Sequence, residues 1–195
     1  MRRYRVVLIL VASALAVAGE LRAQASAHWA SRRVVVGIQM IATPRWSLRE
    51  QTGTFVNREA AYESGWVAGV ELGFLPIPAV QVHGAFEANG GGFGDSSGFS
   101  AFEGGVTVRP WQRGPVVPFG VASLGRMSES GGVRFGFVTV GAGLELPLAR
   151  WIAVRVAVRQ LEPGDASTDR STGPGQTTTV DASMTRWYVG AQLRF

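Results

Sequence analysis

Apolar and polar residues alternate with a period of two along most of the chain. The clearest case is 184–195, in which one set of alternate positions is apolar and the other is polar, small or amphipathic; the apolar set is Trp187, Val189, Ala191, Leu193 and Phe195. Side chains of a β-strand point alternately to opposite faces, so this pattern predicts a strand between two different environments. The same alternation predicts seven further strands, at 33–41, 65–75, 79–88, 99–109, 116–126, 135–146 and 151–161.

Charged residues indicate which face of each expected strand points outward. If the apolar faces meet lipid, an arginine among them near mid-membrane costs roughly 2–4 kcal/mol, so charged positions are expected to point inward. This reasoning predicts an interior polar network, and its members are Glu71, Gln81, His83, Glu87, Glu103, Arg109, Glu145, Arg155, Arg159, Arg186 and Arg194.

The same rule assigns Arg126 to the inner face of segment 116–126. Strand alternation then directs Val117, Phe119 and Val121 outward.

The connections between the expected strands alternate in length. Short, proline-containing segments lie at 76–78, 110–115 and 147–150, and longer polar segments lie at 43–64, 89–98, 127–134 and 162–183. This alternation is typical of membrane barrels with short periplasmic turns and long outer loops. Any extracellular partner is therefore expected at the two longest loops, 43–64 and 162–183. Trp46 and Phe55, in the first of them, either touch such a partner or fold back on the rim.

The first residues have the layout of a secretory signal peptide. Residues 1–5 are basic, 6–18 are apolar, and 23–25 read Ala-Gln-Ala, so we expect a signal peptide at 1–25 and one domain at 26–195. Its removal leaves 15 basic and 13 acidic residues, so the net charge falls from +5 to +2. The high isoelectric point is thus no argument for nucleic-acid binding. The absence of cysteine rules out disulfides and thiolate metal sites.

A terminal aromatic residue with apolar residues at every second position before it resembles the C-terminal signal of bacterial outer-membrane β-barrel proteins. With the strand pattern, the chain resembles the small OmpA/OmpX-type barrels. The resemblance implies an all-β, eight-stranded antiparallel up-and-down transmembrane β-barrel with both termini in the periplasm. Its implied partners are outer-membrane lipid, lipopolysaccharide and the barrel-insertion machinery, which reads the last strand in that family.

The function expected from this pattern is a structural, surface-interaction or envelope role without catalysis or cofactor. Eight strands leave an interior just wide enough for side chains, so the inner charges are expected to form a packed network. Arg159 and Arg186 lie at a height similar to Glu87 and Glu103, and we expect ion pairs between them across the lumen.

Three alternatives stay open. A narrow channel or carrier for small solutes requires an unfilled lumen. A lipid A-modifying enzyme requires an outward histidine beside a serine, whereas His83 has inward parity and no serine on its strand. A lipocalin-type soluble barrel requires the opposite polarity. For the oxygen-rich segment 162–169, a solvated loop is preferred to a Ca²⁺ site.

Overall fold

The computed structural model describes residues 32–52, 55–62, 64–89, 98–112, 114–129, 133–168, 176–181 and 183–195. Eleven strands lie in these ranges: β1 (Val34–Thr43), β2 (Trp46–Thr52), β3 (Phe55–Tyr62), β4 (Gly65–Ile77), β5 (Val80–Asn89), β6 (Phe99–Val108), β7 (Val117–Glu129), β8 (Val133–Pro147), β9 (Ile152–Thr168), β10 (Gln176–Asp181) and β11 (Met184–Arg194). No helix in this described part is long and apolar enough to cross a membrane.

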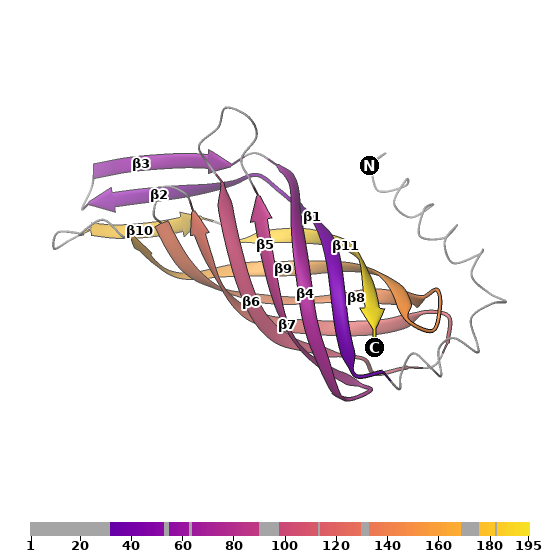
Figure 1. The fold of residues 1–195 in the computed structure, drawn as a ribbon. Helices are drawn as coiled ribbons and strands as arrows, with labels where there is room; N and C mark the ends of the chain where they lie inside the picture. The colour runs from indigo at the N-terminus through magenta and orange to yellow at the C-terminus, as the bar shows by residue number, and fades with distance from the viewer. Residues whose placement is uncertain are drawn as a thin grey trace.

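Eight of the strands close into an antiparallel barrel in the order β1-β11-β9-β8-β7-β6-β5-β4. The first and last barrel strands pair along their length, from Val35 opposite Arg194 to Ala42 opposite Trp187. At one end the backbone nitrogen of Phe195 donates to the carbonyl of Val34 at 2.9 Å. The prediction of an eight-stranded up-and-down barrel is confirmed (Figure 1).

The remaining strands form a separate three-stranded sheet in the order β10-β2-β3, which extends beyond one end of the barrel (Figure 1). We call this the sheet end and the opposite end, where Val34 meets Phe195, the terminal end. The eight predicted strands did not include these three, which lie within the long polar connections 43–64 and 162–183. The antiparallel ladders satisfy backbone donors and acceptors of these polar segments without requiring an apolar face.

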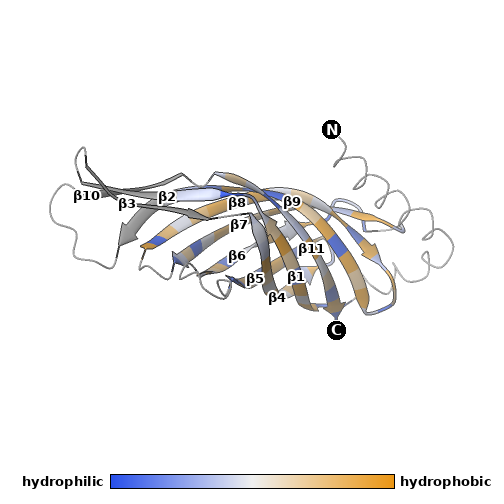
Figure 2. Cartoon of the chain, turned by 90° about the horizontal axis from the view of Figure 1, so that it is seen from above, coloured by the Kyte–Doolittle hydropathy of each residue, from blue (hydrophilic) through white to orange (hydrophobic). Residues whose placement is uncertain are grey.

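The barrel carries apolar side chains outside and charged ones inside, as predicted. Ile38 and Leu72 are 66% and 64% exposed, whereas Glu71 and Arg155 are 2% and 7% exposed. Figure 2 shows the resulting alternation of hydrophilic and hydrophobic residues along the barrel strands. This polarity is the reverse of that of a lipocalin-type soluble barrel and excludes that alternative.

Strand β7 has the opposite parity to the one predicted. Val117, Phe119 and Val121 are buried and point into the lumen, while Leu124 and Arg126 are exposed on the outer face. The prediction assumed that every charge points inward. Arg126 is an exception to this rule. It lies beyond the last outward-facing apolar side chain of its strand, where the free-energy cost of exposing a charge falls toward zero.

The predicted long connection at 127–134 is also wrong. Strand β7 continues to Glu129 and β8 begins at Val133, so the connection is limited to residues 130–132. Inward Met127 and Phe135 are both buried, which explains why the ladder continues past the expected boundary.

Candidate functional site

The lumen is filled in successive layers, and the first of them, near the terminal end, centres on Glu145. Its carboxylate accepts hydrogen bonds from Arg109 Nε at 3.0 and 3.1 Å and from Arg194 Nη2 at 2.7 Å. The Nε of Arg155 lies 3.4 Å from the same carboxylate. Glu145 is completely buried, so the guanidinium groups of Arg109 and Arg194 provide the hydrogen bonds that water would otherwise supply, and Arg155 adds a third positive charge.

Glu71 is the second carboxylate of this layer. It accepts from Arg155 Nη1 at 3.0 Å, from Gln81 Nε2 at 2.7 Å and from Gln192 Nε2 at 2.9 Å. The Oε1 of Gln81 in turn accepts from Arg109. Because Arg155 contacts both carboxylates, the layer is a single connected network that joins five strands, and Arg109, directly after β6, across the lumen.

The second layer consists of two ion pairs nearer the sheet end. Arg159 Nη1 lies 2.6 Å from Glu103, and Arg186 Nη2 lies 2.7 Å from Glu87. Each pair joins strands three steps apart in the barrel order, β9 to β6 and β11 to β5. The guanidinium of Arg159 also stacks over the Tyr188 ring, 4.1 Å from its centroid. These are the bridges across the lumen that the heights of the residues predicted.

His83 lies on the inner face, and it is buried. Its backbone is in register with Gly73 on β4 and Gly105 on β6, so it has no side chain directly beside it on either strand. Neither ring nitrogen has a hydrogen-bond partner among the described residues. A serine–histidine pair that faces lipid is therefore not built around this residue.

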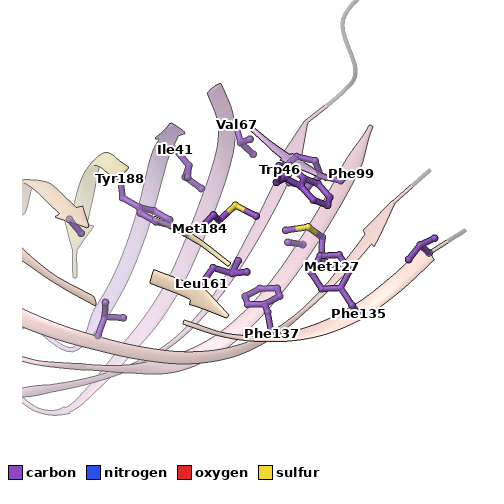
Figure 3. Packing of buried hydrophobic residues seen from close by; sticks show 14 of the residues in the cluster. Ile41, Trp46, Val67, Phe99, Met127, Phe135, Phe137, Leu161, Met184 and Tyr188 are labelled. Carbon is purple, nitrogen blue, oxygen red and sulfur yellow. The ribbon is translucent and has the colours of Figure 1, made fainter. Parts of the chain in front are cut away.

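The third layer, at the sheet end, is mainly apolar (Figure 3), although buried Glu129 lies at this level, opposite Phe99. Trp46, at the start of β2, folds over the barrel mouth and packs edge-on against Phe99 and Phe135, with ring centroids 6.0 and 6.2 Å apart. The main side chains beneath and around it are Ile41, Val67, Met127, Phe137, Leu161, Met184 and Tyr188. The expected packed network of inner charges therefore does not fill this end of the lumen.

Ten of the eleven charged or ionisable residues predicted for the interior lie on the inner face, and Arg126 is the exception. The layers also use Tyr188 and Gln192, which belong to the polar set of 184–195, and Ser123, which inward parity would have found once β7 was correctly assigned. Trp46 folds back rather than extending outward, and the side chain of Phe55 lies outside the described residues. On β11, Trp187 and Val189 are exposed on the outer face, as is Phe195 after the strand.

No group of three or more His, Asp or Glu side chains is placed to hold a metal ion in the described part of the chain. Of the oxygen-rich segment considered for Ca²⁺, residue 169 lies outside that part.

The barrel matches solved structures of small outer-membrane proteins. Outer membrane protein OprG from Pseudomonas aeruginosa aligns with a TM-score of 0.55 at 10% identity, over 84% of this chain and 96% of that one. Neisserial surface protein A aligns with a TM-score of 0.56 at 13% identity, over 83% and 97% of the two chains. OprH from P. aeruginosa gives 0.54 at 14% identity, over 84% and 99%.

No protein-family model and no curated protein sequence matches this chain. At these identities the structural matches establish the fold alone: the chain has the fold of the small outer-membrane β-barrels.

Proposed function

We propose that this chain is an integral outer-membrane protein whose barrel is a non-catalytic scaffold for the β10–β2–β3 sheet, with a surface-interaction or envelope-structural role. The observation that carries the proposal is the polarity of the barrel wall. Large apolar side chains such as Leu72 and Ile38 cover the outside, while the arginines and glutamates are paired within. Such a wall is stable only where lipid covers it, because water would contact a continuous apolar band.

In the proposed orientation both termini lie in the periplasm and the sheet lies outside the cell. Because the chain has no cysteine, single-cysteine variants test this directly. Arg45 at the sheet end and Arg150 at the terminal end are both exposed. A membrane-impermeant maleimide should label Arg45→Cys on intact cells but Arg150→Cys only after the outer membrane is opened. Labelling with the opposite preference would refute the orientation.

The crossing ion pairs favour a scaffold over a narrow channel. Two ionic layers and an apolar layer succeed one another along the lumen, and each is made of side chains from opposite walls. Purified protein in a planar bilayer should give no conductance above that of the bilayer alone. Stable single-channel steps that persist after repurification would favour the channel instead.

The buried position of His83 favours a role without catalysis. Lipid A extracted from cells that express the wild type and from cells that express His83→Ala should have the same mass. A mass change that depends on His83 would establish a lipid A-modifying enzyme.

The sheet is the proposed site for an extracellular partner. Strands β2, β3 and β10 come from 43–64 and 162–183, and Trp46 anchors the sheet to the apolar layer of the barrel. Replacing residues 48–62 by a short turn should leave the barrel folded. The variant should no longer bind the host or envelope component that binds to the wild-type protein. Loss of the barrel itself would show that the sheet is part of the folding unit.

The outward residues of the last strand are proposed to be read during insertion, as in the barrels that the chain resembles. Phe195→Ala should lower the amount of protein inserted into the outer membrane, whereas Phe74→Ala, an exposed phenylalanine on another strand, should not. Equal loss in both variants would assign the effect to the apolar surface in general.

A further inference from the structure

A groove lies in the outer wall of the barrel where β11, β1, β4 and β5 run side by side, and its volume is about 520 Å³. Two rows of side chains form its long sides, and the members of each row are cross-strand neighbours. Gly69 lies between the rows, and because its position belongs to the inner face, only backbone forms the floor there. One row contains Met40, Ala68 and Ala88, and the other contains Ile38, Val70 and Phe86.

The direction of the groove determines what fits it. The rows follow cross-strand pairs and therefore run across the strands, which tilt by about 35–45° from the axis of such a barrel. The groove is thus inclined to the membrane normal by about 45–55°, whereas an acyl chain extends along that normal. An acyl chain therefore crosses the groove instead of lying in it. A compact side chain of a neighbouring protein can enter it, and the alanines in its sides allow two membrane proteins to pack closely.

Phe86, at the β5 end of the groove, is 47% exposed and supplies such a side chain. It pairs in register with Val70, and the strand tilt shifts neighbouring strands by about one residue, so Phe86 is level with Gly69. A two-fold axis parallel to the barrel axis, between β4 and β5, therefore brings Phe86 of each copy over the groove floor of the other. Such a contact is closed and uses the same surface of both copies. The membrane permits this axis, because copies inserted in the same direction are related by a rotation about the membrane normal.

The area of the contact supports the same arrangement. Two smooth barrels would touch over the height of the apolar band, about 25 Å, and over about three strands, which gives roughly 350 Å² per copy. The total of roughly 700 Å² is below the limit of about 1,000 Å² for a specific interface. An aromatic side chain carries about 150–250 Å², so two half-exposed rings that enter the two grooves add roughly 400 Å² when the groove walls are included. The insertion of Phe86 into the groove therefore decides whether the contact is stable.

We propose that two copies of this chain dimerise in the membrane through this groove, with Phe86 of each copy placed over Gly69 of the other. The proposal rests on the membrane location proposed above, and it goes further by naming the partner, a second copy, and the face that binds it.

Crosslinking in phospholipid vesicles tests the face, because the chain has no cysteine of its own. Val70→Cys places a thiol beside the groove, and Val140→Cys on β8 is the matched control, since the two valines are 52% and 51% exposed. With a short bis-maleimide at low protein density, Val70→Cys should give a crosslinked dimer, and Val140→Cys should give only the yield of chance collisions.

Sedimentation equilibrium of the full-length protein in density-matched detergent measures the strength of the contact. Phe86→Ala removes an aromatic contact from each copy and should weaken dimerisation by roughly tenfold or more. Ala68→Phe fills the groove and should leave a monomer. Leu124→Ala, which truncates a 68% exposed side chain on β7, is the control and should dimerise as the wild type does.

Equal crosslinking of the two cysteine variants, or equal dimerisation of Phe86→Ala and Leu124→Ala, would overturn the inference. So would a lipid molecule that native mass spectrometry finds on monomeric wild type but not on Ala68→Phe, because an acyl chain would then occupy the groove. Folding of every protein is checked by electrophoretic mobility with and without heating. Wild type that fails to fold in phospholipid vesicles would refute the membrane location as well, whereas folded wild type that stays monomeric would refute the dimer alone.

Discussion

Replacing Glu145 by glutamine tests whether the ionic layer near the terminal end stabilises the barrel. The side chain is completely buried and is contacted by Arg109, Arg155 and Arg194. Glutamine has nearly the same shape but no charge, and one of its two polar ends becomes an N–H₂ donor. That donor would face guanidinium groups, which are donors themselves, so at least one arginine would lose its acceptor as well as its counter-charge.

The size of the effect follows from the geometry. A single pair of unit charges 4 Å apart contributes about 4 kcal/mol at an effective dielectric constant of 20. Three such contacts are lost, but the desolvation of Glu145 is also relieved, and one hydrogen bond to the glutamine oxygen can remain. Removal of one partner from a buried ion pair destabilises proteins by about 3–5 kcal/mol, and we expect Glu145→Gln to lie in this range.

The assay is a urea titration of the protein folded in phospholipid vesicles, followed by tryptophan fluorescence and by electrophoretic mobility. Glu162→Gln is the matched control, because Glu162 is exposed on the outer wall and bonded to Ser183 and Gln160. Its free energy of unfolding should change by less than about 1 kcal/mol. If the two variants differ by less than about 1 kcal/mol, the network fills space without stabilising the barrel, and the reasoning fails.

Three further sets of variants extend this test with the same titration. Glu87→Leu should cost about 3–5 kcal/mol because Arg186 stays buried without its partner, and Glu87→Leu/Arg186→Met should recover most of the loss; an additive double variant would contradict this account. Trp46→Ala should destabilise by about 3–5 kcal/mol and Trp46→Phe by less, since Trp46 is 5% exposed and packs on two phenylalanines; no change would show that the mouth of the barrel folds independently of β2. Gly141→Ala should destabilise by about 1–3 kcal/mol because its Cβ would meet the Val158 carbonyl and Arg159, whereas Gly120→Ala has room and should be nearly neutral; equal effects would refute the close approach.

Most of the barrel could be predicted from alternation and charge because both report the same physical division between lipid and lumen. Seven strands carry a Glu, Gln or Arg that can only be accommodated inward, and this fixes their parity. On β7 the buried inward charge is Glu129, which lies beyond the predicted segment 116–126. Within that segment the inward positions include Phe119 and Ser123, and the only charge, Arg126, points outward and gave the wrong parity.

The apolar layer could have been found in the sequence. On most strands the inward position nearest the sheet end is apolar, as Val67, Leu161 and Met184 illustrate. The sequence analysis missed this apolar layer because it assumed that the inside of a membrane barrel is polar. The three-stranded sheet could not be predicted in the same way, because the pairing of β10 with β2 joins segments that are more than a hundred residues apart in the sequence.

The inward glycines explain how so narrow a barrel accommodates arginines and aromatic rings. An added Cβ on Gly125 would meet the ring of Phe137, and one on Gly143 would meet the ring of Phe119, which lies directly opposite. Phe119 in turn supports the guanidinium of Arg155, 4.2 Å from the ring centroid. A large inward side chain thus lies over a glycine of the adjacent strand. It occupies the space that a side chain at the glycine position would otherwise take, and the narrow lumen is filled in this way. The glycines on the inner face are therefore part of the packing of the lumen, and alanine at Gly125, Gly141 or Gly143 would force the facing rings, guanidinium group or backbone to shift.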